Sequence, residues 1–164
     1  MKRSQFLALG SMCLLLSVGH TSSQVRSKQE ALTRTDSVRA SVFQYQISKF
    51  GHRYRPYVNL YFLGIEEKSG GDPSPAVMRS LRSKNYSVKS TSESAPTRHG
   101  IFDKKTKAPG LSFDVTDILF LSTSKAKAQG SIYQSPKVGE AADYTIELIH
   151  GKWKVTKCHV TVVY

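Results

Sequence analysis

Helically spaced and alternating hydrophobic residues divide the chain into short helices followed by a run of strands. Residues 35–50 place hydrophobic side chains mostly on one side of a helix, and Thr35 or Asp36 can cap its first turn. Residues 57–66 form a short apolar run rich in β-branched and aromatic residues, which predicts a strand covered on both faces. A helix is therefore expected before the first strand.

A second helix is predicted within the segment GGDPSPAVMRSLRSK. Asp72 supplies an N-cap oxygen, and Pro73 suits the first helical position because it has no amide hydrogen to leave unpaired. The helix would bury a short hydrophobic stripe made of Val77, Met78 and Leu81.

Strand patterns dominate the rest of the chain. Helix, strand, helix and then antiparallel strands predict an α+β fold, in which a curved antiparallel sheet packs against N-terminal helices. The expected strands are residues 86–89, 100–103, 111–122, 126–133, 141–149 and 153–164.

The last two strands have a defined register if His150 and Gly151 form a two-residue turn. Directly opposed residues share a face of a sheet, so apolar and charged pairs sort to opposite faces. We expect the apolar pairs to anchor the core and an ion pair to fix the outer face. The register pairs Ile149 with Lys152, Leu148 with Trp153, Glu147 with Lys154, and Ile146 with Val155.

The hydrophobic alternation slips beyond this hairpin. The parity of Trp153 differs from that of Cys158, and a period of two cannot keep both on one face without an inserted residue. We predict a bulge near residues 156–157 and, from the same switch in an earlier strand, a second one near residues 116–117. Bulges bend strands, so the sheet should form a cup.

The motif GKWKV, residues 151–155, with the preceding YTIELI strand, is similar to the closing hairpin of the NTF2-like, cystatin-like superfamily. The layout from FQYQ through YFLGIE to DPSP also resembles small uncharacterised exported bacterial proteins. The resemblance implies an NTF2-like cone with a pocket between sheet and helices. It implies no reaction, because the superfamily includes isomerases, hydrolases, dehydratases and members that only bind or dimerise.

The N-terminus has the pattern of a secretory signal peptide. Lys2 and Arg3 precede an apolar run, residues 6–18, that is too short and too early for a stable membrane span. Small residues lead up to Gly19, so cleavage is expected after Gly19. Cleavage after Ser23 is the alternative. An uncleaved anchor is the other interpretation.

The expected organisation has three parts. Residues 1–19 form the signal peptide, residues 20–34 a loose polar lead-in, and residues 35–164 a single α+β domain. The mature protein would be exported to the periplasm or the extracellular space, and it would contain no transmembrane span. Its one remaining cysteine, Cys158, cannot form an internal disulfide.

The chain is basic, with a net charge of +12 that falls to +10 when Lys2 and Arg3 leave with the signal. The basic residues are scattered and no run reaches five, which favours a generally basic surface over a dedicated polyanion groove. Nucleic acid is not expected as a partner. Outside the cytoplasm the accessible polyanions are envelope phosphates, acidic sugars and anionic lipids. A weak attraction to such polyanions is expected.

Two residues could support catalysis. Asp117 interrupts an apolar face, and His159 in the last strand could act with it, as in a small hydrolase or isomerase. The alternative is that Asp117 is solvated in the predicted bulge and His159 points outward.

Ligand binding without catalysis is the function that the sequence favours. The chain has no nucleophile elbow, phosphate loop, dinucleotide motif or close pair of metal ligands, so neither a cofactor nor a metal is expected. We expect a small ligand or a protein partner, with a homodimer included, to bind in the cup. The candidate ligand-binding residues are Tyr45, Tyr61, Tyr144 and Trp153, for which an aromatic core is the other interpretation.

Overall fold

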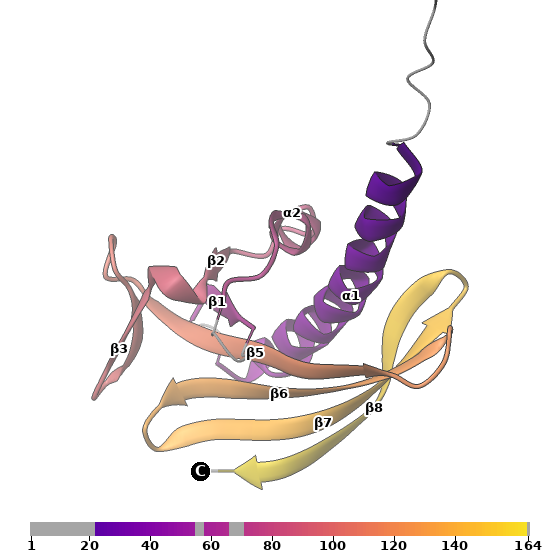
Figure 1. Cartoon of the computed structure of the whole chain (residues 1–164). Coiled ribbons are helices and arrows are strands. Elements are labelled where there is room, and N and C mark those ends of the chain that lie inside the picture. Colours follow the sequence, from indigo (N-terminus) through magenta and orange to yellow (C-terminus); the bar gives the residue numbers. More distant parts are fainter. Residues whose placement is uncertain (1–21, 55–57, 66–70, 164) are drawn as a thin grey trace, which may run out of the picture.

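The computed structural model describes residues 22–54, 58–65 and 71–163, which form a helical layer over a curved sheet (Figure 1). The helical elements are α1 (Ser22–Lys49), η1 (Gly51–Tyr54), α2 (Pro75–Arg82) and η2 (Thr91–Glu93). The strands are β1 (Tyr61–Gly64), β2 (Val88–Ser90), β3 (Ser94–Thr97), β4 (Gly100–Asp103), β5 (Pro109–Phe120), β6 (Lys125–Ser135), β7 (Val138–Ile149) and β8 (Lys152–Val163).

The sheet bends around α1 in the order β2-β1-β5-β6-β7-β8, with β4 beside β5 and β3 beside β4 (Figure 1). Helix α1 contacts β5, β7 and β8, so it crosses the sheet on its concave side. This arrangement confirms the α+β class and the expected NTF2-like layout of a curved sheet packed against N-terminal helices.

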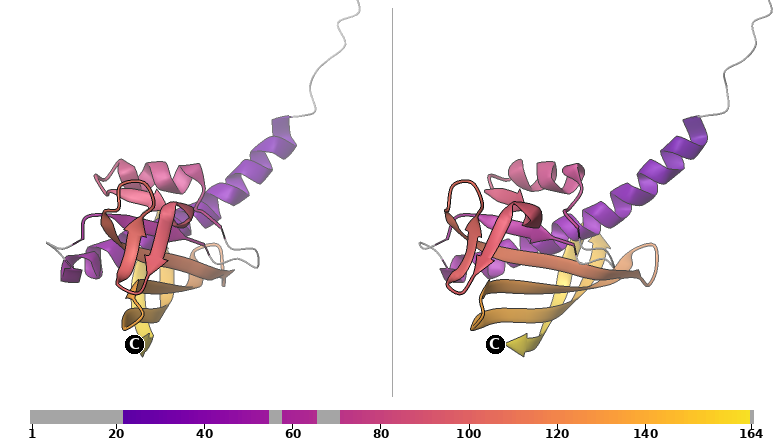
Figure 2. Two further views of the ribbon diagram at one scale, coloured as in Figure 1. Left: turned by 90° about the vertical axis from the view of Figure 1, so that its left-hand side faces the viewer. Right: turned by 60° about the vertical axis from the view of Figure 1, so that its left-hand side comes forward.

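Helix α1 begins at Ser22, well before the start expected at Thr35. The backbone of residues 22–34, expected to be a loose lead-in, is therefore helical. This stretch contains good helix formers and no Gly or Pro, and its lack of hydrophobic periodicity hid it. Asp36 lies inside the helix and accepts a hydrogen bond from Ser74 Oγ at 2.6 Å instead of capping a first turn. Figure 2 shows the N-terminal part of α1 projecting beyond the sheet.

Helix α2 begins two residues later than expected. The sequence offers two consecutive cap–proline pairs, and the second is used: Ser74 is the N-cap and Pro75 lies in the first turn, instead of Asp72 and Pro73. Asp72 accepts hydrogen bonds from the backbone nitrogen and Oγ of Ser92, at 3.0 and 2.5 Å. The predicted hydrophobic stripe is confirmed, since Val77, Met78 and Leu81 are buried.

Strand β1 departs from the expected antiparallel run. It pairs in parallel with both β2 and β5. Parallel neighbours need a crossover connection, and α2 lies in the one that joins β1 to β2. All four residues of β1 are buried, which confirms a strand covered on both faces.

The closing hairpin has the predicted register from the turn through four residue pairs. His150 and Gly151 have φ angles of 50° and 72°. Positive φ at both central residues is typical of the tight turn that matches the twist of two antiparallel strands.

Both predicted bulges are present. The register of β7 with β8 shifts between Thr145 and Ile146, which leaves Thr156 as the extra residue. The register of β5 with β6 shifts after Thr116, and Asp117 in this bulge has a φ of 48°. Bulges increase local bending, which accounts for a sheet that curves around α1.

Two expectations about side chains of the hairpin are wrong. Glu147 lies opposite Lys154, but its ion pair is with Lys125 of β6, where Oε1 and Nζ are 3.3 Å apart. Glu147 has a lysine on each neighbouring strand, so sequence counting could not choose between them. Leu148 is 39% exposed and does not anchor the core, because the hairpin end extends past the tightly packed region.

Small residues on β6 let α1 approach the sheet closely. Ala126, Ala128 and Gly130 are buried on one face of this strand. Gln46 of α1 is fully buried against this strand. A Cβ on Gly130 would lie 2.5 Å from Asp114 O and 2.9 Å from Gln46 Nε2, so only glycine fits there.

Candidate functional site

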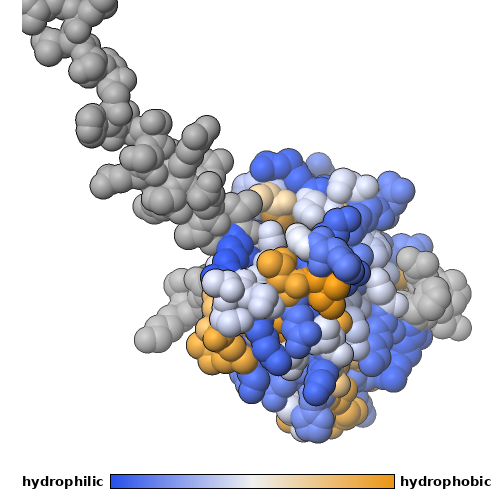
Figure 3. Space-filling view, turned by 90° about the vertical axis from the view of Figure 1, so that its right-hand side faces the viewer, coloured by the Kyte–Doolittle hydropathy of each residue, from blue (hydrophilic) through white to orange (hydrophobic). Residues whose placement is uncertain are grey.

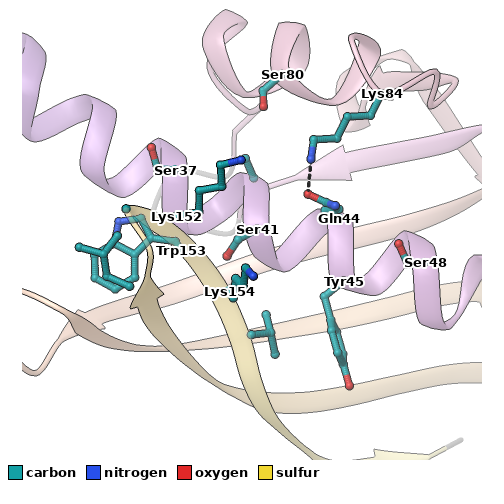
Figure 4. A pocket seen from close by; sticks show the side chains of 14 residues that line it. Ser37, Ser41, Gln44, Tyr45, Ser48, Ser80, Lys84, Lys152, Trp153 and Lys154 are labelled. Carbon is teal, nitrogen blue, oxygen red and sulfur yellow. Dashed lines mark hydrogen bonds between the residues drawn. The ribbon is translucent and has the colours of Figure 1, made fainter.

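A groove with a volume of about 740 Å³ lies between α1, α2 and the start of β8, and we call it the α1–α2–β8 groove (Figure 4). Its floor is the solvent-facing side of α1. Its walls are α2 on one side and the closing hairpin on the other. Its lining residues are Ser37, Ala40, Ser41, Gln44, Tyr45, Ser48, Ser80, Lys84, Leu148, Gly151, Lys152, Trp153, Lys154 and Val155.

The floor of the groove is polar because of helical spacing. Ser37, Ser41, Gln44 and Ser48 recur at intervals of three or four residues and so share one face of α1. The opposite face carries the buried residues Val38, Val42, Phe43 and Ile47, which pack on the sheet. The same amphipathic pattern that docks the helix therefore leaves a row of short hydrogen-bonding side chains along the groove.

Positive charge enters the groove from both walls. Lys84 lies in the turn that follows α2, and its Nζ donates a hydrogen bond to Gln44 Oε1 at 2.7 Å (Figure 4). Lys152 and Lys154 come from the start of β8. None of the described residues that line the groove is an Asp or a Glu. The groove is thus a cationic, hydroxyl-rich site.

Trp153 forms the aromatic end of the groove. Its ring packs edge-on against Phe120, with ring centroids 5.9 Å apart. The Arg34 guanidinium lies over both rings, 4.0 Å from the Phe120 centroid and 5.6 Å from that of Trp153. Arg34 also donates to the Ser122 carbonyl oxygen. These contacts join α1 to the ends of β5 and β8 and hold the indole in place.

Tyr45 also lines the groove, toward its other end. Its ring lies edge-on to Tyr144, with centroids 5.9 Å apart. Its hydroxyl accepts a hydrogen bond from Lys49 Nζ at 3.0 Å, and this bond is the main reason that the pKa of Lys49 is raised. Tyr45 and Trp153 are therefore the two candidate aromatic residues placed where a ligand could touch them.

Tyr61 and Tyr144 belong to the hydrophobic core. Tyr61 is 2% exposed and packs on Phe113, with ring centroids 5.7 Å apart. Tyr144 is 1% exposed, and its hydroxyl accepts a hydrogen bond from Gln46 Nε2 at 3.3 Å. Burial raises the pKa of the Tyr144 hydroxyl well above its usual range. Both side chains therefore pack in the core, and Tyr144 also borders the second hollow described next.

Asp117 and His159 line a second hollow of about 1000 Å³, which we call the sheet hollow. Both are exposed, and Asp117 sits in the β5 bulge. Strands β6 and β7 separate them, which is three interstrand spacings, or about 14 Å along a flat sheet. His159 lies opposite Asp143, whose Oδ1 accepts from Gln129 Nε2 at 3.0 Å. The two residues therefore line one hollow from strands that are not neighbours.

Cys158 lies on the helix-facing side of β8, opposite Tyr144, and is partly buried. His159, the next residue, takes the other face, so no Cys–His pair forms locally. No three His, Cys, Asp or Glu side chains of the described residues come together in a way that could hold a metal ion. Within the same residues, every helix is too short or too polar to cross a bilayer.

Comparisons with known proteins give one structural likeness. No family model and no curated protein matches the chain. A solved structure, an NTF-2 like protein of unknown function from Shewanella oneidensis MR-1, aligns at 15% identity and a TM-score of 0.30 over 84% of this chain and 99% of that one. The α+β, NTF2-like layout stands on the arrangement of α1 over the curved sheet, and no inference on function follows from this likeness.

Proposed function

We propose that this chain is a non-catalytic binding domain and that the α1–α2–β8 groove is its binding site, which receives a negatively charged small ligand or partner segment. The observation that carries the proposal is the charge of the groove lining. Among the described residues, this lining contains Lys84, Lys152 and Lys154 and no carboxylate. Three cations facing one hollow favour an anion, since opposite charges attract and like charges exclude cationic ligands.

The form of the groove supports the same proposal. Its volume of about 740 Å³ falls in the range of sites for small ligands. The Ser41 hydroxyl donates to the Val38 carbonyl oxygen and can still accept a hydrogen bond, and the side-chain nitrogen of Gln44 can donate one. Trp153 offers a flat surface for an apolar part of the ligand. A ligand with both kinds of portion could place its anionic portion near the lysines and its apolar portion against Trp153.

The second candidate function is a small hydrolase or isomerase that uses Asp117 and His159. The observation in its favour is that both residues line the sheet hollow. Against it, both side chains are exposed and lie on strands separated by two others. No hydrogen bond joins these two side chains to orient them as an acid–base pair, and both positions lack the burial that would tune the pKa values of such a pair.

Export is part of the proposal. The expected signal, residues 1–19, lies outside the described residues, so its evidence is the N-terminal sequence pattern. Expression in a bacterial host followed by N-terminal sequencing of the mature protein tests it. A mature end at His20 or Gln24 supports export, whereas an intact Met1 in the cytoplasmic fraction contradicts it.

A titration followed by nuclear magnetic resonance tests the groove as the binding site. Inorganic phosphate and succinate are added to the labelled protein at low salt. Saturable shifts of the Trp153 indole and the Gln44 side-chain amide are expected. Lys84→Glu, an exposed change, should abolish these shifts without unfolding the protein, and Ser41→Phe should do so by filling the groove.

The matched control is Lys127→Glu, which reverses an exposed lysine of the sheet hollow instead of the groove. It should leave both titrations unchanged. If the shifts gather around Asp117 and His159, and disappear in Lys127→Glu but not in Lys84→Glu, the site is the sheet hollow and the proposal is wrong.

A further inference from the structure

Strand β8 presents an open edge for pairing. It is the last strand of the sheet, and among the residues that the structure describes it pairs with β7 alone. Within the described residues, no backbone hydrogen bond joins residues 152–163 to any other segment. In a strand with one neighbour, about half of the backbone N–H and C=O groups point away from that neighbour. Those groups are available to a further strand.

This open edge borders the α1–α2–β8 groove. Five consecutive residues, 151–155, line the groove. Side chains alternate between the two faces of a strand, so consecutive residues can line one hollow only where the edge of the backbone itself faces it. The groove therefore combines a strand edge as one wall with the polar face of α1 as its floor.

The dimensions fit a short extended chain. The polar row on α1 runs from Ser37 to Ser48, which is about 16 Å of helix at ~1.5 Å per residue. An extended chain rises ~3.3 Å per residue, so about five residues would span that length. A strand of this size would lie alongside the first part of β8.

The charges of β8 favour a partner strand with acidic side chains. Lys152 and Lys154 alternate with Trp153 and Val155, so the lysines share one face and the apolar residues the other. A strand added here would meet the lysines with every second side chain, and acidic residues at those positions would form opposite-charge cross-strand pairs. The side chains between them would face Ser41 and Gln44.

A second copy of β8 does not fit the part of this edge that borders the groove. Residues 152–157 carry Lys152, Lys154 and Lys157 and no Asp or Glu. Two copies paired through these residues would place lysines opposite one another, and like charges of this kind keep exposed edges from pairing with themselves. Figure 3 shows only small hydrophobic areas, separated by hydrophilic surface, on one face of the molecule, so an extended apolar contact is not offered there.

We propose that the occupant of the groove is an extended acidic segment of a partner protein, which adds to the open edge of β8 as a further strand with acidic residues at alternate positions and small polar residues between them. This inference rests on the proposed function, because it assigns the ligand class of the same groove. Main-chain hydrogen bonds to β8 supply affinity, and the lysines supply specificity.

The test uses an octapeptide of alternating Glu and Thr, acetylated and amidated at its ends. Trp153, the single tryptophan of the chain, reports binding by fluorescence, and amide hydrogen exchange reports pairing. We expect a saturable emission change and exchange slowed at least tenfold at the outward amides of residues 152–155. Binding should weaken with added salt, since the lysines are exposed to solvent.

Two control peptides separate strand pairing from charge attraction. A peptide of the same sequence with alternate backbone nitrogens methylated keeps the charges and loses the donors, and it should bind at least tenfold more weakly. A Lys–Thr peptide should not bind. The double variant Lys152→Glu, Lys154→Glu should reverse this preference, whereas Lys157→Glu, beyond the bulge, should not.

Equal binding of the methylated peptide would overturn strand addition, and so would unchanged exchange in β8. If phosphate and succinate bind in the groove while the Glu–Thr peptide does not, this inference fails and the proposed function stands. If neither the small anions nor the peptide perturbs Trp153, both fail.

Discussion

Tyr144 lies directly opposite Cys158, one residue farther along β8 than an unbroken register counted from the turn would place it. Thr156 is the extra residue and forms a bulge. Because of it, Cys158 faces the helix as Tyr144 does. The bend lets the start of β8 turn toward α1 while the rest of the strand continues along β7. One extra residue therefore positions one wall of the α1–α2–β8 groove.

Deletion of Thr156 should straighten β8 without changing which face its residues occupy, because Lys157 would still lie opposite Thr145. Without the bend, Trp153 should withdraw from Phe120. We expect a red shift of its emission and a loss of about 1–3 kcal/mol in the free energy of unfolding. Fluorescence and urea denaturation measure both.

Deletion of Thr161 provides the matched control for that experiment. The register of β7 with β8 also shifts near its other end, and Thr161 is the extra residue there. Its removal should leave the Trp153 emission unchanged. Wild-type emission in the Thr156 deletion would show that the bulge does not place the indole.

Strand register and curvature were predictable because both depend on a period of two. The slip between Trp153 and Cys158 could be counted directly, and the structure places the bulge where the count requires it. The start of α1 was not predictable in this way. Residues 22–34 have no apolar stripe, so their helical structure rests on backbone propensity, which carries no positional pattern.

The groove was only partly predictable. Tyr45 and Trp153 were candidates because large aromatic residues often line sites, but Lys84 and Lys152 were not. The polar spacing of Ser41 and its neighbours was visible within the first helix, yet such a face is ordinarily solvated. Only the tertiary contacts show that α2 and β8 form the walls of the groove beside α1, because these three segments are far apart in the sequence.

Gly130→Ala should destabilise the protein. The added Cβ would lie 2.5 Å from the Asp114 carbonyl oxygen, which is backbone and cannot move aside. The β-sheet would have to shift away from Gln46, at a cost of about 1–3 kcal/mol. Gly71→Ala is the control, since its nearest contact is Ile65 Cγ1 at 3.4 Å. Thermal denaturation compares the two, and equal melting temperatures would contradict the close fit at Gly130.

Asp103→Asn should remove a contribution to stability that is present only above acidic pH. The carboxylate forms an ion pair with Lys89 and accepts the backbone N–H groups of Lys105 and Thr106 at 2.8 and 2.6 Å. The Lys89 ion pair and then the backbone hydrogen bonds hold the pKa of Asp103 well below its ordinary value of 3.8. A carboxyl group whose pKa is lower in the folded state than in the unfolded state stabilises the fold above pH 3.8. This stabilisation disappears as the pH falls toward the folded-state pKa.

Urea denaturation at pH 7, 5 and 3 checks the effect of Asp103→Asn. The variant should be less stable than the wild type at pH 7 and 5, and the gap should narrow at pH 3. Asp143→Asn, at an exposed position of β7, is the control and should show a much smaller gap at pH 7. A gap for Asp103→Asn that stays constant from pH 7 to pH 3 would disprove the electrostatic origin.

Arg34→Met should loosen the aromatic end of the groove. Methionine keeps an aliphatic stem but loses the guanidinium that lies over Phe120 and Trp153, so we expect a loss of about 0.5–2 kcal/mol in unfolding free energy. The Trp153 emission should shift, because the cation that holds the ring is gone. Arg34→Lys is the matched control, because it retains the charge without a planar group to stack. Its unfolding free energy should lie between that of the wild type and that of Arg34→Met. If Arg34→Lys and Arg34→Met are equally destabilised, planar stacking and not charge holds the indole, and unchanged emission in both would show that Phe120 alone positions it.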